Sequence, residues 1–416
     1  MGIKGLKSLI EYLNTIQIIH ISSFKGKTIA IDISYILTKS SINNIKAENT
    51  TGIKSNPNQY ILDIINLIHK FAKYGIKVIF IFDGKSTPLK QNTLIKRQKL
   101  KQNAKHKITK LNLDILDCIE NIDNIDSGID RSIDSSIDRS IDSSIDSIED
   151  TDDIKDLDVE IKILQMQIQI YKEKTKCTYI KLEHIEKCKD LLDLMCVEWY
   201  HIENVEADFI CKYLFNKKLV YAILSCDSDF ILHGCRIFCD LDYKYDTIKQ
   251  LYIDNDFITS KIRITKEQLI IGCIASGTDY NLGLSLTYSK LADIIDYIRT
   301  YHIISIQDFI DKLPEINSSR ITIGKKPMTI PNGFIDRYFQ IYDIFTTDNI
   351  TDDIKKYIDC KIQSYLDTIN DSSTSCDNIE QIKILILTIS NNLEETNKIE
   401  KQYFRKVDEY FRYIEI

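Results

Sequence analysis

The chain is 416 residues long, is 44% hydrophobic and carries a formal net charge of −7 at pH 7, which allows one large or two ordinary globular domains. It contains no run of 18 uncharged apolar residues and no signal-peptide h-region, so we expect neither membrane insertion nor secretion. Its 11 cysteines include no CxxC pair, so we predict reduced core residues of an intracellular protein rather than zinc ligands or disulfides.

Two buried strands with a helix between them are predicted near the start of the chain. Thr28–Asp32 and Lys77–Phe82 are apolar, β-branched runs; the first ends in an aspartate and the second is followed by Asp83. Between them, Tyr60–Ala72 has isoleucines at i, i+3, i+4 and i+7, the pattern of an amphipathic helix. The Asn-, Lys- and Ser-rich stretch Ser40–Asn58 is predicted to be a loop. These segments predict a right-handed βαβ unit with parallel strands.

A basic helix is predicted directly after this unit. Lys90, Arg97 and Lys101 recur at about helical spacing, and residues 1–110 carry 19 Lys and Arg against 5 Asp and Glu. Such a face is suited to bind phosphates and to neutralise charge in a phosphoryl transition state, and we count Lys101 among the substrate-binding residues. The alternative is an ordinary Lys-rich helix that is only solvated.

An acidic, low-complexity segment follows the basic helix. Residues 111–160 hold 17 acids against 3 bases, and from Ile129 to Asp146 the unit Ile-Asp-(Ser/Arg)-Ser repeats. On an ideal helix the isoleucines of a four-residue repeat drift by about 40° per repeat and form no continuous stripe. We therefore expect residues 121–150 to be a solvated, largely disordered insertion, with mimicry of a phosphate backbone as the alternative. Order should resume with a helix at Val159–Lys174.

Four more acids stand near the ends of predicted elements in the second half of the chain. The apolar run Val220–Leu224 reads as a buried strand and leads into Asp227 and Asp229, one residue apart. Glu206 and Asp208 stand at the start of a predicted helix, where carboxylates also favour the helix dipole. Their position just before the strand makes a metal site the better interpretation.

The aspartates that follow strands are predicted to meet at one edge of the sheet, because the carboxyl ends of parallel strands share that edge and ligands bind there. A further candidate, Asp279, follows Gly277, where an apolar helix breaks. Like charges at close range raise one another's pKa, so a cation is expected among them. Oxygen-only ligands favour magnesium or manganese over zinc. The residues expected to converge are Asp32, Asp83, Asp227 and Asp229.

With these motifs, the sequence resembles the flap endonuclease and XPG-type family of structure-specific 5′ nucleases. The resemblance covers about residues 1–110 and 175–295. Seven acids in order at the family's positions, together with the N-terminus, are more specific than any single motif. The matching motifs are Met-Gly-Ile-Lys-Gly-Leu at the N-terminus, Ile-Ala-Ile-Asp32, Phe-Asp83-Gly-Lys, Lys90 with Lys96-Arg97, Glu206-Ala-Asp208, Asp227-Ser-Asp229 and Gly277-Thr-Asp279-Tyr.

The resemblance implies a site for two magnesium ions, for which manganese can substitute. Asp208 stands where the family usually has Glu, a longer side chain. The first ion is implied to be held by Asp32, Asp83, Glu206 and Asp208, and the second by Asp227, Asp229 and Asp279. Lys90 and Arg97 match a basic pair that contacts the scissile phosphate. Gly2 matches a terminal glycine that lies close to DNA, and Gly277 matches a backbone contact to it.

The implied fold is an α/β, PIN-like architecture in which helices flank a mainly parallel central sheet, with a helical arch and a helical C-terminal region. The family's helical hairpin, which grips the duplex backbone, is degenerate here because Leu286 and Tyr288 stand at its two glycine positions. The predicted regions are an N-terminal nuclease region (1–110), an acidic insertion in the arch segment (111–165), an internal nuclease region (166–285) and a helical C-terminal region (286–416).

The implied activity is magnesium-dependent hydrolysis of DNA phosphodiester bonds at junctions of single and double strands, such as 5′ flaps, during replication, repair or recombination. Branched or flapped DNA is the implied partner. No sliding-clamp peptide follows Gln402, and we expect a monomer. The Ile-, Lys-, Asn- and Asp-rich composition favours an AT-rich genome, such as that of a large DNA virus. The resemblance implies residence in the nucleus, or at a viral replication site if the protein is viral.

Other functions remain compatible with these residues. Asp227-Ser-Asp229 also fits an aspartate-nucleophile phosphatase, although that interpretation leaves the other acids unexplained. A DNA-junction-binding protein without turnover would keep the same fold. Within the nuclease class, flap cutting, 5′-exonuclease action and junction resolution all stay open, as does an RNA substrate.

Overall fold

The computed structural model describes residues 2–52, 56–133, 152–280, 290–369, 375–390 and 396–414. These residues divide into two compact units, each of which is described by itself. Unit 1 comprises Met1–Ser40, Asn56–Leu94 and Ile180–Ile416, and unit 2 comprises Ser41–Ser55 and Ile95–Tyr179. Every helix in the described ranges is too short or too polar to cross a bilayer.

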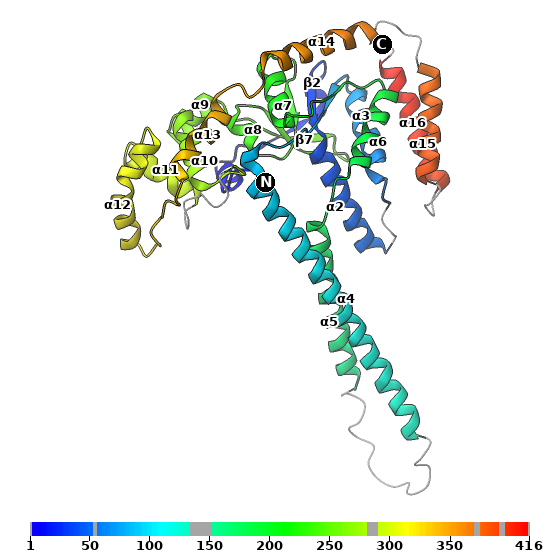
Figure 1. Cartoon of the computed structure of the whole chain (residues 1–416). Helices are drawn as coiled ribbons and strands as arrows, with labels where there is room; N and C mark the ends of the chain where they lie inside the picture. Colours follow the sequence, from blue (N-terminus) through cyan, green and yellow to red (C-terminus); the bar gives the residue numbers. More distant parts are fainter. Residues whose placement is uncertain are drawn as a thin grey trace. The chain divides into compact units, whose positions relative to one another are not determined.

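Helices make up most of the described chain (Figure 1). They are α1 (Leu6–Tyr12), α2 (Ile33–Thr51), α3 (Gln59–Lys73), α4 (Gln91–Ile133), α5 (Asp152–Lys176), α6 (Leu182–Leu194), α7 (Ala207–Asn216), α8 (Asp229–Leu232), α9 (Asn255–Phe257), α10 (Lys266–Ser276), α11 (Leu291–Thr300), α12 (Ile306–Thr322), α13 (Phe334–Thr346), α14 (Asp352–Ile369), α15 (Ser375–Ser390) and α16 (Thr396–Ile414). Three short turns are η1 (Ile21–Phe24), η2 (Pro88–Lys90) and η3 (Ile258–Ile262).

The seven strands of the described residues form one mixed sheet in the order β1-β7-β6-β5-β2-β3-β4. Neighbouring strands in the part β6-β5-β2-β3-β4 are parallel. Strand β7 is antiparallel to both of its neighbours, β6 and β1. The predicted α/β fold with a mainly parallel sheet is therefore confirmed. The strands are β1 (Gln17–His20), β2 (Thr28–Asp32), β3 (Lys77–Phe82), β4 (Trp199–His201), β5 (Ala222–Leu224), β6 (Ile237–Asp242) and β7 (Thr247–Leu251).

The sheet separates two hydrophobic cores because successive strand residues point to opposite faces. Ala30 and Ile79 face one core, which also contains apolar side chains from α1, α7 and α10–α13. Ile29, Ile31 and Phe80 face the other core, which contains side chains from α3, α6, α15 and α16. Burial on both faces explains why these strands are continuous apolar runs in the sequence.

The two C-terminal helices complete the second core. Helix α16 packs against α3, and α15 packs against α6 and α16 (Figure 1). The Asn66 side-chain amide donates to the Tyr403 hydroxyl at 2.7 Å, and the Tyr410 hydroxyl donates to the Met195 carbonyl at 2.9 Å. Val407 is fully buried between these contacts. Residues near the end of the chain therefore finish a core that begins with α3.

Unit 2 is built on the antiparallel helices α4 and α5. The Lys107 ammonium lies 3.2 Å from the Glu173 carboxylate, and that of Lys101 donates to the Thr178 carbonyl at 2.7 Å. Ala104 of α4 and Ile170 of α5 are both buried. The hairpin thus has one apolar seam along which its helices meet.

Two predictions of irregular structure differ from the structure. The expected loop Ser40–Asn58 is wrong over most of its length, because α2 continues to Thr51. Its Lys, Ala and Glu residues favour helix, whereas its Asn and Ser residues suggested a loop. Helix α4 also extends to Ile133, into the segment expected to be disordered; residues 134–151 lie outside the described residues.

Candidate active site

Acidic side chains follow four neighbouring parallel strands at one edge of the sheet. Asp32 ends β2, Asp83 follows β3, and the loop after β4 leads to Glu206. Asp227 follows β5, which pairs with β2 on the other side. The carboxyl ends of the strands share this edge, so the topology brings together acids that are far apart in the sequence.

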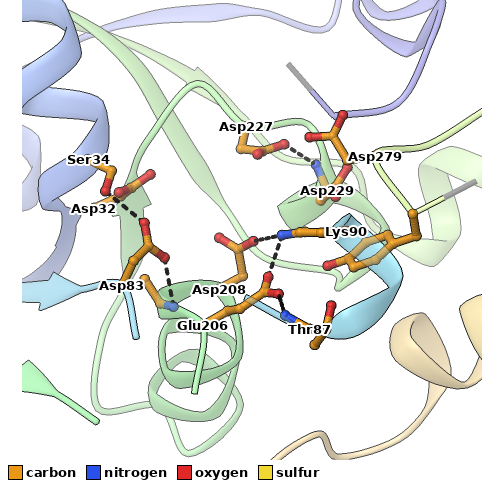
Figure 2. Close-up of polar contacts among 12 residues, drawn as sticks. Asp32, Ser34, Asp83, Thr87, Lys90, Glu206, Asp208, Asp227, Asp229 and Asp279 are labelled. Carbon is orange, nitrogen blue, oxygen red and sulfur yellow. Dashed lines mark hydrogen bonds and ion pairs between the residues drawn. The ribbon is translucent and has the colours of Figure 1, made fainter. Parts of the chain in front are cut away.

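Asp32 and Asp83 are held by hydrogen bonds from neighbouring elements, and Figure 2 shows those of Asp83. The Ser34 hydroxyl donates to Asp83 at 2.7 Å, and the backbone N–H of Ala207 donates to its other oxygen at 3.1 Å. The Ser225 hydroxyl donates to Asp32 at 2.9 Å. These donors orient the two carboxylates and link the ends of β2 and β3 to the β5 loop and to α7.

Gly84 lets the loop after Asp83 approach the loop after β4. Its N–H donates to the Val205 carbonyl at 3.0 Å, and a Cβ on Gly84 would lie only 2.1 Å from the Ile202 carbonyl oxygen and 2.7 Å from that of Glu203. A side chain at this position would therefore push two backbone segments apart.

Replacing Gly84 with alanine is expected to destabilise the protein by about 1–3 kcal/mol, because rigid carbonyls must move to admit the methyl group. Thermal unfolding measures the effect. Gly272→Ala is the matched control: its Cβ would meet only side chains, with the Ile298 Cδ1 at 3.3 Å, and alanine is favoured inside α10. Equal melting temperatures of the Gly84 variant and the wild type would contradict this close approach.

Lys90 carries the positive charge that the structure places among the acids. Its ammonium pairs with Glu206 and lies 3.4 Å from Asp208 (Figure 2). Burial opposes the charge, but Asp208 and Glu206 outweigh it and raise the pKa of Lys90. The backbone N–H of Thr87 donates to the other oxygen of Glu206 at 2.7 Å. The turn η2 thus ties Lys90 to the start of α7.

Asp227, Asp229 and Asp279 form a second group of acids (Figure 2). The N–H of Asp229 donates to Asp227 at 3.1 Å. Asp229 is 1% exposed, and neither of its carboxylate oxygens has a hydrogen-bond partner among the residues that the structure describes. A buried carboxylate without donors is unstable as an anion unless a cation is bound nearby.

The N-terminal segment runs between the two loops of this second group. The N–H of Ile3 donates to the Ser228 hydroxyl at 2.8 Å, and that of Lys4 donates to the Gly277 carbonyl at 2.9 Å. Gly2 has a φ of +90°, and a Cβ there would lie 2.4 Å from a carboxylate oxygen of Asp227. A side chain at this position would occupy the space in front of the acids.

The protonation of the acids reflects their crowding. Burial, reinforced by Asp83, raises the pKa of Asp32 to about 7. Burial also raises the pKa of Asp229, with Asp227 adding to the effect. The pKa of Asp208 is raised by burial and by acids of both groups, although Lys90 opposes this. Charge at Asp208 is therefore coupled to both halves of the cluster.

The donor set fits a hard divalent cation. As they stand, no three or more His, Cys, Asp or Glu side chains of the described ranges are arranged to hold a metal ion. Their chemistry is nevertheless that of a magnesium or manganese site, since all seven acids offer only oxygen. The partnerless oxygens of Asp229 and the raised pKa values of Asp32 and Asp208 indicate a deficit of positive charge.

The structure does not test several other candidates as members of this cluster. Arg97 and Lys101 belong to unit 2, and Lys101 is engaged with the Thr178 carbonyl and the ring of Tyr179. Their predicted contacts with substrate stay predictions. Leu286 and Tyr288 lie outside the described residues. His233, which the sequence analysis did not assign to the site, is buried and packs on Phe345 at a ring distance of 5.3 Å.

Sequence reasoning missed the residues that hold the acids in place. They gave no signal because serine, threonine and tyrosine occur throughout the chain, and only the sheet topology shows what they contact. Tyr280, whose ring lies 4.8 Å from the Lys90 ammonium, could have been suggested by its place beside Asp279. Ser34 and Ser225 donate to acids, whereas Ser228 accepts from the N–H of Ile3 and Tyr280 lies beside Lys90.

Both halves of this site match family models. Residues 1–104 match the XPG N-terminal domain, and residues 199–279 match the XPG I-region. The matched segments contain all seven acids and Lys90. The chain thus contains the N-terminal domain and the I-region of the XPG family of nucleases. The resemblance inferred from the motifs is confirmed, and an aspartate-nucleophile phosphatase is disfavoured.

Relatives of this XPG-family chain are DNA hydrolases by name. A probable RAD2-like endonuclease of Invertebrate iridescent virus 6 is 26% identical over 84% of this chain and 82% of its own length. Flap endonuclease 1 of Theileria parva is 26% identical over 67% of this chain, and the match spans only 47% of that protein. One of these relatives is therefore viral, in line with the expected viral relationship.

A solved structure shows the same fold. The Holliday junction-resolving enzyme GEN1, solved in complex with product DNA and a Mg2+ ion, superposes with a TM-score of 0.57 and 13% identity. The match covers 97% of this chain and 78% of that one. The PIN-like architecture expected for an XPG-family chain is confirmed.

The acids of this XPG-family site predict a pH dependence of metal binding. The pKa of Asp32 rises from an ordinary 3.8 to about 7, so between these values the folded state binds more protons than the unfolded state. The stability of the metal-free protein should therefore fall as pH rises through this window. A divalent cation removes the cost of ionisation, so magnesium should raise the melting temperature more at about pH 8 than at about pH 6.

Thermal unfolding with and without magnesium at both pH values measures this effect. Asp32→Asn is the control, since an amide has no proton to release, and it should shrink the difference. An equal magnesium shift at the two pH values would contradict the prediction.

Proposed function

We propose that this chain is a magnesium-dependent, structure-specific 5′ nuclease. It hydrolyses phosphodiester bonds in DNA at junctions of single and double strands, with 5′ flaps as the main substrate. Its cofactor is a pair of Mg2+ ions, which Mn2+ can replace. The observation that carries the proposal is the convergence of acids that follow four neighbouring parallel strands, with the ammonium of Lys90 paired to two of the acids.

The proposed roles of the acids follow their two groups. One cation would be held by Asp32, Asp83, Glu206 and Asp208, and the other by Asp227, Asp229 and Asp279. When bound, two such ions supply Lewis acidity that activates a water and stabilises the leaving 3′ oxygen. The Ser34 and Ser225 hydroxyls keep Asp83 and Asp32 oriented toward that site.

Lys90 has a separate role in this proposal. It is anchored by Glu206 and Asp208, so binding of a cation by these acids would free its ammonium for an oxygen of the scissile phosphate. Arg97, seven residues further along α4, would contact the same phosphate. Together they would neutralise the charge that develops in the transition state.

The proposed substrate is supported by charge and by the relatives. The basic N-terminal quarter is suited to a polyanion, and the backbone of Gly2 lies close to the second acid group, where a Cβ would be 2.4 Å from Asp227. The Theileria relative is named a flap endonuclease, and the GEN1 neighbour was solved with product DNA. Residence in the nucleus or at a viral replication site stays part of the proposal.

Cleavage of a labelled 5′-flap DNA by the purified full chain tests this function. We expect magnesium-dependent incision at the junction, none with EDTA, and slower cutting of matched single-stranded and nicked-duplex DNA. Cleavage rates of an RNA flap and of a Holliday junction, measured beside the DNA flap, show which class of substrate is cut fastest. Binding of the flap without cutting in either magnesium or manganese would replace the nuclease with a junction-binding protein.

A further inference from the structure

One short segment of unit 1, from Thr87 to Thr93, contacts both groups of acids. At its start, the Thr87 N–H donates to Glu206 at 2.7 Å, and the Lys90 ammonium pairs with the same carboxylate (Figure 2). At its end, in the first turn of α4, the hydroxyl of Thr93 donates to the backbone carbonyl of Asp279. The segment therefore links the first group of acids to the second.

Thr93 occupies a buried position in the first turn of α4. It is 4% exposed, while the apolar Leu94 beside it is 42% exposed, the reverse of the usual distribution of polar and apolar residues. Inside a helix a threonine hydroxyl often donates to a carbonyl three or four residues earlier, as that of Thr109 does to Lys105. The Thr93 hydroxyl instead donates to a residue 186 positions later. It therefore serves the loop of Asp279 and not its own helix.

The loop that carries Asp279 is joined to the N-terminal segment at one residue and to α4 at another. The N–H of Lys4 donates to the Gly277 carbonyl at 2.9 Å, and two residues further on the Asp279 carbonyl accepts from Thr93. The carbonyl and the carboxylate of Asp279 belong to the same residue. A bond that fixes the peptide plane therefore also limits the directions in which the carboxylate can point.

We propose that Thr93 is a positioning residue that holds Asp279 for the second cation of the site. The inference rests on the proposed function, in which Asp279 binds that cation with Asp227 and Asp229. The hydroxyl is not counted among the ligands. It acts by joining the loop of Asp279 to the segment that carries Lys90, so that the Lys90 ammonium and the second acid group keep one spacing.

Calorimetric titration of the metal-free full chain with Mn2+, in the absence of DNA, tests this role. Thr93→Val keeps a β-branched side chain of similar shape but removes the hydroxyl. We expect the affinity for the second ion to fall about tenfold, because residues that orient metal ligands typically contribute about 10–100-fold to metal affinity. Thr93→Ser keeps the hydroxyl and should bind Mn2+ as the wild type does.

Thr15→Val is the matched control for the loss of a hydroxyl. The half-buried Thr15 also donates to a backbone carbonyl, that of Ile10 at 3.2 Å, which belongs to neither acid group. This variant should leave Mn2+ binding unchanged. An unchanged Mn2+ affinity in Thr93→Val, an equal loss in Thr15→Val, or a Thr93→Ser variant that binds as weakly as Thr93→Val would overturn the proposal.

Single-turnover cleavage of the flap substrate separates positioning from general damage to the fold. In Thr93→Val the Mg2+ concentration that gives half the maximal rate should rise about tenfold, while the rate at saturating Mg2+ returns to near that of the wild type. A lower maximal rate with an unchanged Mg2+ requirement would overturn the proposal, since it would reflect only a loss of folded protein. A wild-type chain that neither binds Mn2+ nor cuts the flap would remove the proposed function itself, whereas a Thr93→Val variant that behaves as the wild type would remove only the role of Thr93.

Discussion

The variant Asp229→Asn should lose cleavage by more than about a hundredfold, the upper range for residues that merely orient metal ligands. Asparagine keeps the shape of the side chain but removes the negative charge that binds a cation. At the same time the variant should be at least as stable as the wild type. Asp229 is 1% exposed, its oxygens lack donors among the described residues, and burial with Asp227 raises its pKa. Removing that charge relieves repulsion in the metal-free protein.

Single-turnover cleavage of the flap substrate and thermal unfolding without metal measure the two effects. Asp336→Asn is the matched control, because Asp336 is exposed on α13 and should change neither quantity. Loss of activity with a clear loss of stability would mean that Asp229 is structural. Retained activity would remove Asp229 from the metal site.

The variant Lys90→Met should lose both cleavage and stability. Methionine fills a similar volume but leaves Glu206 and Asp208 without the ammonium that they share. Removing one partner of a buried ion pair typically costs about 3–5 kcal/mol. The loss should be smaller at low pH, where Asp208, whose pKa is already raised by burial, takes up a proton. Magnesium should restore much of the stability, because a cation can replace the missing charge.

Melting temperatures with and without magnesium, at two pH values, measure this behaviour beside single-turnover cleavage. Lys85→Met is the control, since Lys85 is exposed in the same loop and is expected to change stability little. Recovery of stability without recovery of cleavage would support a role for Lys90 at the phosphate. If magnesium restored neither stability nor cleavage, Glu206 and Asp208 would not be metal ligands.

The parts of the fold that the sequence predicted are those with a strong local signal. Strands β2 and β3 are buried on both faces, so their residues form unbroken apolar runs, and an aspartate follows directly. Parallel pairing then determines where Asp32 and Asp83 lie, without any knowledge of the intervening residues. The position of the acid cluster was therefore predictable from strand ends alone.

Other features depend on contacts between distant residues and have no local signal. The Ser225 hydroxyl binds Asp32 across 193 residues of sequence, and Lys90 reaches Glu206 across 116. Spacing predicted that Lys90 faces the substrate, but it could not show that the Lys90 ammonium also pairs with two acids. Helix α2 was missed because its polar residues give it little amphipathic pattern, and composition alone does not separate such a helix from a loop.

The packing of α16 on α3 has a consequence for how the chain folds. Asn66 is hydrogen-bonded to Tyr403, 337 residues away, so the core around α3 stays open until Tyr403 has been synthesised. Contacts at such separations form slowly, because a long loop must close before they are gained. While translation continues, the apolar face of α3 is exposed to solvent and to other nascent chains, which makes this face the natural place for a chaperone to act.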